Sequence, residues 1–307
     1  MRRREERAGQ GRNRSPRSWR RPAIVLAAAA LVAVAAVAAL AVRAASPDDP
    51  PAPRGATGPD ANPSPPAATT QPETETAPPP ATTPDLAHVR GAVIAIDPGH
   101  NGGNFRHPDE INRQVDAGTL RKACDTTGTQ TDGGYTEAAY NLDVARRLAR
   151  ILTRAGAEVV LTRTTDDGWG PCITERAAVA NRANADVAVS IHADGGPADG
   201  RGFHVIYPPP VEGLTDDVAD ESRRLALALR AAYRTTGMPQ ATYIGEAGLD
   251  VRTDLGGLNL SDVPKVLLET GNMRNAEDAA LLESPAFRRR AAAAIARGLD
   301  AYLRDAS

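Results

Sequence analysis

Two histidines stand where apolar segments of the chain give way to glycine-rich turns. His100 follows "VIAIDPG" and precedes "NGG", and His192 follows "VAVSI" and precedes "ADGG". Small residues beside an imidazole leave room for a bound ion. Catalytic zinc takes three protein ligands, often two histidines and a carboxylate, and keeps a fourth position for water or substrate. The pair therefore suggests a hydrolytic metal site, and the alternative is two histidines with structural roles in the core or loops.

Two glutamates are candidates for the remaining roles at such a site. Glu137 falls in the first turn of an expected helix, where the helix dipole favours a carboxylate, so capping is the alternative to metal binding. Glu269 ends the apolar run "KVLL", where an unpaired carboxylate is costly unless it is functional. Near a metal-bound water it could act as general base and then as acid to a leaving amine. The alternative for Glu269 is a salt bridge, to Arg274 or to Arg163.

The types and positions of the other polar residues point less clearly to a chemical role. His204 lies within an expected strand, His107 in a polar loop and His88 in a linker, so all three are expected to be structural or surface residues. Asp97 stands three positions before His100. It is expected either to accept a hydrogen bond that orients His100 or to cap the turn.

The segments that must position these residues alternate between strand and helix patterns. Strands are expected at 91–99, 157–163, 185–194, 200–208 and 264–272, and helices at 136–156, 173–184, 215–236 and from 276 to the C-terminus. This alternation predicts an α/β domain with three αβα layers and a central, mostly parallel sheet of about six strands. Ligand sites in such sheets form at the carboxyl ends of the strands. We therefore expect His100, His192 and Glu269 to meet at one edge.

The chain before this domain divides into three segments. Residues 1–22 are strongly basic, and residues 23–42 carry no charge over roughly the 20 residues that a helix needs to cross a membrane. Basic residues before the span place the N-terminus in the cytoplasm and the rest of the chain outside. An uncleaved transmembrane anchor and a cleaved signal peptide are both compatible with this pattern. Residues 43–88, rich in Pro, Ala and Thr, are expected to form a disordered linker ahead of a catalytic domain at 89–307.

The composition indicates in which compartment the domain lies and which kind of partner it is not expected to bind. The 307 residues carry a formal net charge of -2, which gives no indication of nucleic-acid binding. Lys122 and Lys265 are the only lysines among the basic residues. The two cysteines, Cys124 and Cys172, both fall in the exported part and predict one disulfide, whereas a cysteine-ligated metal would need closer spacing or more partners. A monomer is the default expectation.

Five motifs follow one another between residues 91 and 303: "AIDPGHNGG", "TEAAYNLDVARRLARIL", "GAEVVLTR", "RAAVANRANADVAVSIHAD" and "DVPKVLLETGNMRN". Their order resembles that of zinc-dependent N-acetylmuramoyl-L-alanine amidases of the amidase-3 family, and is most similar to the compact, exported amidases of actinobacteria. The resemblance implies that His100, Glu137 and His192 are zinc ligands. It also implies that Glu269 is the catalytic acid/base.

The resemblance implies a peptidoglycan hydrolase that cuts the amide between N-acetylmuramic acid and the L-alanine of the stem peptide. Peptidoglycan is then the substrate, the membrane is contacted only through the N-terminal segment, and any activator protein is unidentified. Stem peptides carry carboxylates, so a basic residue is expected near the cleft, although the sequence does not select one. The alternatives are another zinc hydrolase, such as a peptidoglycan peptidase or carbohydrate deacetylase, and a non-catalytic wall-binding protein. The presence of all four polar residues argues against the last.

The chain also departs from the family pattern. Asp194 stands where the family usually has Asn after "SIHA", and "GNMRN" replaces "GFISN" after the catalytic glutamate. Arg176 matches a family position and is expected to be structural. The long segment 101–136, which contains Cys124, is expected to lie over the cleft and to limit access to it.

Overall fold

A six-stranded sheet runs through residues 86–306, the part of the chain that the computed structural model describes. In spatial order its strands are β4 (Glu158–Leu161), β1 (Val93–Pro98), β5 (Val187–Asp194), β8 (Lys265–Asn272), β6 (His204–Tyr207) and β7 (Leu249–Val251). Every neighbouring pair is parallel except β6 and β8, which are antiparallel. The expectation of a mostly parallel sheet of about six strands is confirmed.

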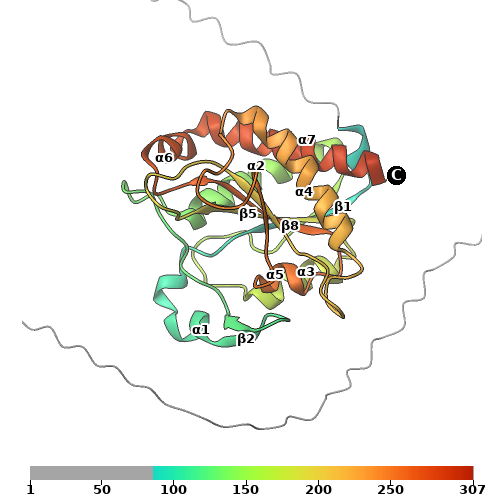
Figure 1. Ribbon diagram of the computed structural model, residues 1–307, viewed down its shortest axis with the longest axis horizontal. Coiled ribbons are helices and arrows are strands. Elements are labelled where there is room, and N and C mark those ends of the chain that lie inside the picture. Colours follow the sequence, from blue (N-terminus) through green and yellow to red (C-terminus); the bar gives the residue numbers. More distant parts are fainter. Residues whose placement is uncertain (1–85, 307) are drawn as a thin grey trace, which may run out of the picture. The chain divides into compact units, whose positions relative to one another are not determined.

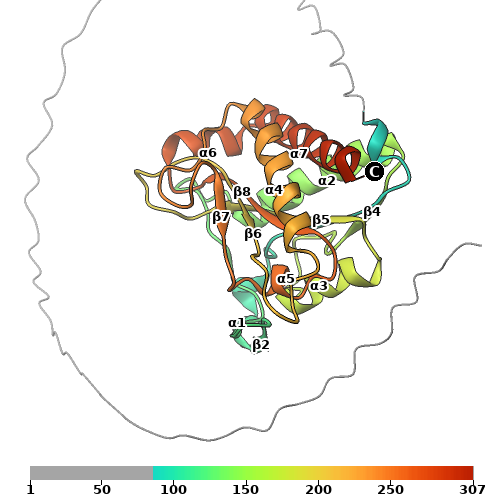
Figure 2. The same ribbon diagram turned by 45° about the vertical axis from the view of Figure 1, so that its right-hand side comes forward.

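Helices cover both faces of this sheet, so the three αβα layers are confirmed as well (Figures 1 and 2). One face carries the long helices α2 (Glu137–Ala155), α4 (Ala219–Tyr233) and α7 (Pro285–Ala306), with the shorter α6 (Ala276–Glu283) at their end. The other face carries α3 (Ile173–Arg182) and the single turn α5 (Gly256–Asn259). The second face is therefore covered by much less helix than the first.

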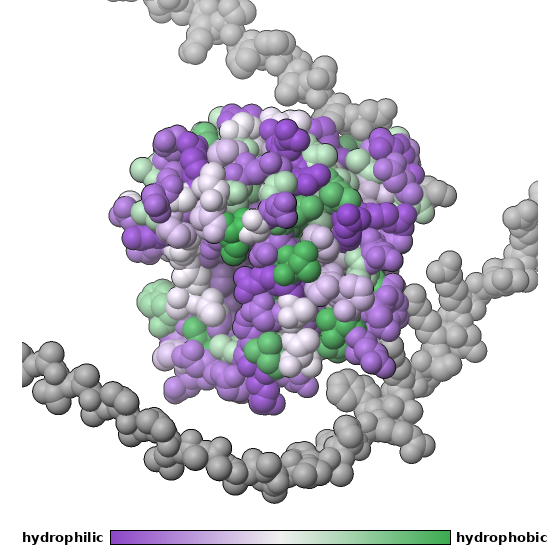
Figure 3. All heavy atoms as spheres, in the orientation of Figure 1, coloured by the Kyte–Doolittle hydropathy of each residue, from purple (hydrophilic) through white to green (hydrophobic). Residues whose placement is uncertain are grey.

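A small satellite lies on the side of the thinly covered face (Figure 1). It consists of α1 (Pro108–Asn112) and a two-stranded antiparallel sheet of β2 (Gln114–Asp116) and β3 (Arg121–Ala123). Three short 3-10 helices complete the secondary structure of the described residues: η1 (Ala87–Val89), η2 (Asn104–Arg106) and η3 (Arg234–Thr236). Figure 3 shows hydrophobic side chains on this view of the surface only as small patches among hydrophilic ones.

The alternation of side chains along β5 separates core from site. Val187, Val189 and Ile191 belong to the main apolar core under the long helices. Ser190 and His192 point to the opposite face, where they line a pocket. Because successive residues of a strand face opposite sides, β5 supplies the core and the site at once.

Helix α2, which carries Glu137, begins and ends with local signals that the sequence contains. The Thr136 hydroxyl accepts a hydrogen bond from the backbone N–H of Ala139, which satisfies one free donor of the first turn. Gly156 ends the helix in the left-handed conformation, with φ of 96°. The expected stop at Gly156 is confirmed, and Glu137 lies in the first turn as expected.

Several expected boundaries differ from the structure. The expected last helix is two helices, because the chain breaks at Ser284 and restarts with Pro285 at the first position of α7. Strand β7 and the turn α5 were not expected, and neither was regular structure between residues 101 and 136. The expected helix from residue 215 begins only at Ala219.

Residues before 89 also take part in the folded domain. His88, assigned to the linker by the sequence, lies in η1, and its backbone N–H donates to Asp300 Oδ1 of α7 at 2.8 Å. The basic segment 1–22, the apolar segment 23–42 and most of the linker lie outside the described residues. Between residues 86 and 306, no helix is long and apolar enough to cross a membrane.

Gly298 allows α7 to approach α4, and its substitution provides a test of this packing. A Cβ on Gly298 would lie 2.9 Å from Leu229 Cα, so the helices would have to separate. We expect Gly298→Ala to lower the free energy of unfolding by about 1–3 kcal/mol, despite the better helix propensity of alanine. Chemical denaturation measures this change. Arg289→Ala, at an exposed position of the same helix, is the control, and equal stability of both variants would contradict the packing argument.

Candidate active site

His100, Glu137 and His192 meet at the carboxyl ends of β1 and β5. Glu137 Oε1 lies 3.2 Å from His100 Nε2 and 2.9 Å from His192 Nδ1. All three potential ligand atoms lie within 4.8 Å of one another, and no other such group occurs between residues 86 and 306. Two imidazole nitrogens and one carboxylate are the donor set of many catalytic zinc sites, so these residues fit that metal.

The turn between β1 and His100 explains why glycine precedes the histidine. A Cβ on Gly99 would lie 2.1 Å from the His192 ring, so only glycine permits the two histidines to come together. The rings are 4.9 Å apart and nearly perpendicular. His100 itself takes a positive φ of 56°, an uncommon conformation for a residue with a side chain. The backbone is therefore shaped to bring the His100 imidazole over the sheet edge.

Backbone and side-chain donors fix both oxygens of Glu137. Oε2 accepts from the N–H of Thr129 at 3.0 Å, and Oε1 accepts from Asn141 Nδ2 and the N–H of Ala193, both at 3.3 Å. Burial alone would raise the pKa of Glu137, but His100 and His192 hold that pKa well below its usual value. The group is thus a carboxylate, the form in which it can bind a metal.

The Nδ1 atom of His100 faces away from Glu137 toward a second carboxylate. It lies 3.3 Å from Asp125 Oδ1 and 3.1 Å from the carbonyl oxygen of Thr126. A carbonyl can only accept, so Nδ1 carries a proton, and Nε2 is the ring nitrogen on which a metal can replace a proton. Although burial lowers the pKa of His100, Glu137 and Asp125 raise it to about 10. The surroundings are strongly negative and favour a cation.

Sequence analysis did not identify Asp125. It has no distinctive spacing from His100, and the only nearby signal is that it directly follows Cys124. The predicted disulfide between Cys124 and Cys172 is confirmed. It joins the end of β3 to the residue before α3, and so brings Asp125 beside that helix.

Asp97 plays neither of the roles expected for it. Its carboxylate accepts from Arg176 at 2.9 Å and from Lys265 at 3.2 Å, as well as from the hydroxyls of Thr162 at 2.7 Å and Ser190 at 2.8 Å. Burial would raise the pKa of Asp97, but Lys265 and Arg176 hold it well below its usual value. Asp97 is thus the centre of a buried ion cluster beneath the site, and Asp125 is the residue that contacts His100.

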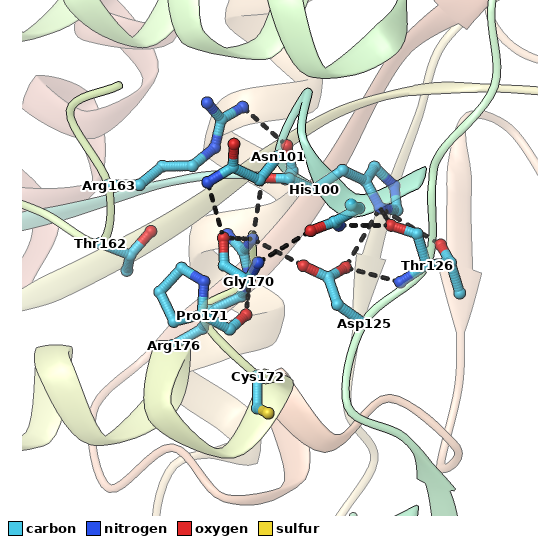
Figure 4. A network of polar contacts seen from close by, with 12 residues as sticks. His100, Asn101, Asp125, Thr126, Thr162, Arg163, Gly170, Pro171, Cys172 and Arg176 are labelled. Carbon is cyan, nitrogen blue, oxygen red and sulfur yellow. Dashed lines mark hydrogen bonds and ion pairs between the residues drawn. The ribbon is translucent and has the colours of Figure 1, made fainter. Parts of the chain in front are cut away.

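Arg176 connects this buried cluster to the site (Figure 4). Besides Asp97, its guanidinium donates to Asp125 Oδ2 at 3.0 Å and to the carbonyl oxygens of His100 at 2.9 Å and Pro98 at 2.7 Å. The residue is 4 % exposed, so these bonds are shielded from water. Arg176 therefore fixes the position of both His100 and the carboxylate that orients it.

Glu269 lies beside His192, because the two residues are register partners on the parallel strands β8 and β5. Neither expected salt bridge forms: Arg274 pairs with Asp132, and Arg163 donates to backbone carbonyls and to Asp166. Within residues 86–306, the buried Oε2 of Glu269 has no hydrogen-bond partner. A carboxyl oxygen left free beside a metal-type cluster is available for chemistry.

The surroundings of Glu269 favour its protonated form. Burial raises its pKa well above the usual value, and the nearby carboxylates of Glu137 and Asp194 raise it further. Asp194, the departure from the family pattern, accepts from the Tyr243 hydroxyl at 2.9 Å and from the N–H of Gly195 at 2.7 Å. Asp194 thus ties the end of β5 to the loop that carries Tyr243.

The other histidines lie apart from the metal-type cluster. His204 is buried on β6 beneath Tyr243, with the two rings 6.2 Å apart. His107 pairs with Glu110 at 3.4 Å, close to the Trp169 ring. The structure therefore brings together only two of the five histidines.

Asp97→Asn tests the buried ion cluster. It leaves Arg176 and Lys265 without their shared charge, so we expect the free energy of unfolding at pH 7 to fall by about 3–5 kcal/mol. The pKa of Asp97 is lower in the folded than in the unfolded chain, where it is about 3.9. Its contribution is therefore present above that pH and disappears as the pH falls through the folded pKa.

Denaturation of wild type and variant at several pH values measures this difference, which should shrink below about pH 4. Asp262→Asn, at an exposed position, is the control and should change stability by less than about 0.5 kcal/mol. A difference that does not depend on pH would contradict the assigned charge state of Asp97.

Residues 94–301 match the amidase-3 family, which is described as N-acetylmuramoyl-L-alanine amidase. The chain is similar to N-acetylmuramoyl-L-alanine amidase Rv3717 of Mycobacterium tuberculosis, with 43% identity over 219 residues, which span 71% of this chain and 88% of that protein. The family match covers every residue of the site.

Two crystal structures are similar over the same region. N-acetylmuramyl-L-alanine amidase Ami1 from Mycobacterium smegmatis has a TM-score of 0.67 and 43% identity, covering 71% of this chain and 99% of that one. Ami1 from Mycobacterium abscessus has a TM-score of 0.66 and 45% identity, covering 70% of this chain and 100% of that one. Sequence, fold and site geometry agree, and the chain belongs to the amidase-3 family of N-acetylmuramoyl-L-alanine amidases.

Proposed function

We propose that this protein is a zinc-dependent N-acetylmuramoyl-L-alanine amidase of peptidoglycan. It would hydrolyse the amide that joins the lactyl group of N-acetylmuramic acid to the L-alanine of the stem peptide, in cell-wall remodelling or separation. The observation that carries this proposal is the cluster of His100, Glu137 and His192 beside the unpaired carboxyl of Glu269. Family membership supports the choice of substrate.

His100, Glu137 and His192 would hold the zinc ion. When bound, zinc lowers the pKa of its water and polarises the scissile carbonyl. Asp125 and the carbonyl of Thr126 keep the proton on Nδ1 of His100, which leaves Nε2 free to bind. Thr129 and Asn141 hold the Glu137 carboxylate in place while the substrate enters.

Glu269 would move the proton that the reaction requires. A cation bound at the site would offset the carboxylates of Glu137 and Asp194 that raise the pKa of Glu269, so that Glu269 would be ionised. Its carboxylate would then take a proton from the attacking water as the oxygen bonds to the lactyl carbonyl carbon. The same carboxyl then gives the proton to the alanine nitrogen as the carbon–nitrogen bond breaks. The products are a lactyl carboxylate on an intact glycan and a peptide with a free L-alanine amino group.

The proposal extends to where the protein acts. Peptidoglycan lies outside the membrane, which agrees with the disulfide at Cys124 and Cys172. Residues 23–42 would serve either as a single-pass anchor with a cytoplasmic N-terminus or as a cleaved signal that releases the protein to the cell wall. We propose that the catalytic domain acts as a monomer.

Mass spectrometry of digested peptidoglycan tests the reaction directly. We expect the protein to release stem peptides that begin with a free L-alanine amino group and to leave the glycan strands intact. A zinc chelator should abolish the release, and added zinc should restore it. Cleavage within the peptide or loss of acetyl groups would instead identify a peptidase or a deacetylase.

Two substitutions separate metal binding from proton transfer. We expect Glu269→Gln to retain zinc and to lose at least about 100-fold in cleavage rate, because the general acid/base is gone. Glu137→Gln should lose both zinc and cleavage. Zinc content and the rate of peptide release are the measurements. Full cleavage by Glu269→Gln would refute its role as acid/base.

A further inference from the structure

A pocket of about 190 Å³ opens beside His100 and His192 on the thinly covered face of the sheet. Its lining includes Lys122 and Lys265, the only two lysines of the whole chain. The side chain of Lys265 is 1% exposed and that of Lys122 is 33% exposed, so Lys265 lies on the floor and Lys122 at the mouth. The pocket therefore leads from solvent past a lysine to the proposed metal site.

The walls of the pocket are mostly apolar. Leu255 and Leu258 of the α5 region, Leu267 of β8 and Ile173 of α3 contribute aliphatic side chains. Such walls fit the aliphatic part of a ligand, and polar groups at the ends of a pocket select its orientation.

The two lysines differ in their freedom to bind a ligand. Lys265 is buried against Asp97, within a cluster where Arg176 and Asp125 balance the remaining charge. Lys122 instead forms part of a cluster at the mouth, near enough to solvent to exchange partners. The mouth is therefore the place where a ligand charge can be recognised.

At the mouth, one carboxylate binds two cations. Asp254 accepts from Lys122 Nζ at 2.9 Å and from Arg252 Nε and Nη2 at 2.8 and 2.7 Å. Two cations thus share one carboxylate, and the ammonium and guanidinium groups retain N–H bonds for a further acceptor. A carboxylate at the mouth would accept charge-assisted hydrogen bonds from these groups.

The chain geometry places this cluster close to the reacting bond. Lys122 precedes Asp125 by three residues, and Asp125 contacts His100. Three residues span at most about 11 Å, which is the reach of a two- to three-residue peptide.

We infer that Lys122, Arg252 and Asp254 form a subsite that binds a carboxylate of the stem peptide, one or two residues beyond the scissile amide. This inference rests on the proposed function. The pocket walls receive the aliphatic part of the peptide, and the mouth cluster distinguishes a free carboxylate from its amide. Because the subsite lies one or two residues from the scissile amide, it raises the affinity for the acidic peptide and takes no part in proton transfer.

Two substrates that differ by one group test the subsite. Both are N-acetylmuramoyl-L-alanyl-D-glutamate with the γ-carboxyl blocked as a methylamide; one has a free α-carboxylate, and the other has that group amidated. We expect wild type to have the lower KM for the free acid. Lys122→Met should raise that KM by about tenfold, the effect of one charge-assisted hydrogen bond, and should leave kcat and the KM of the amide unchanged.

Arg121→Met is the matched control. Arg121 is the neighbouring residue of β3, has the same charge, and donates to the carbonyl oxygen of Gln114 without lining the pocket. We expect it to behave as wild type on both substrates. Asp254→Asn should have the opposite effect to Lys122→Met, because freeing the two cations lowers the KM of the acid several-fold.

The outcomes separate the subsite from the proposed function. An unchanged KM for the acid in Lys122→Met, or equal losses on acid and amide, would overturn the subsite. So would wild-type activity on sacculi without cleavage of the free acid, because that substrate contains every group that the subsite is inferred to bind. Failure of wild type to release L-alanine-terminated peptides even from sacculi would overturn the proposed function instead.

Discussion

The buried guanidinium of Arg176 is the interaction on which the geometry of the site depends. It spans two carboxylates, Asp97 on the sheet and Asp125 on the loop that follows β3, and it also binds carbonyl oxygens on either side of Gly99. A planar group with five fixed donors can join several acceptors at once, which a lysine could not do. The strained turn at His100 and the carboxylate that orients its ring are thus held by one side chain.

Negatively charged side chains gather around this group, at the edge of the sheet that holds the proposed metal site. Glu137, Asp125 and Asp194 all lie near the histidines or Glu269, and the positive charges nearest to them are engaged below the site. A divalent cation between the histidines would compensate this field, so the same arrangement that lowers the pKa of Glu137 prepares the site for a metal. Glu269 lies outside the paired charges and has the opposite shift, which distinguishes the proposed acid/base from the proposed metal-binding carboxylate.

The sequence predicts those parts of the structure that depend on regular periodicity. Strands β1, β5 and β8 are continuous apolar runs, and a parallel sheet gathers their carboxyl ends, so the meeting of His100, His192 and Glu269 follows from pattern alone. Strand β7 and the turn α5 are too short to show a hydrophobic period. The loops before them contain no sequence pattern that predicts either element. The role of Asp125 depends on a cross-link and on Arg176, which are contacts between distant segments. Asp97 shows the same limit, because its partners come from α3, β5, β8 and the residue that follows β4.

The contact between His88 and Asp300 fixes where the first 85 residues join the domain. The chain enters through η1, beside the end of α7 and ahead of the first residue of β1 (Figure 1). The proposed zinc ligands stand at the other end of that strand, about 20 Å away. The attachment point and the catalytic edge are therefore opposite poles of the sheet. A chain joined ahead of residue 86 therefore meets the domain at the end of β1 that is remote from the proposed zinc ligands.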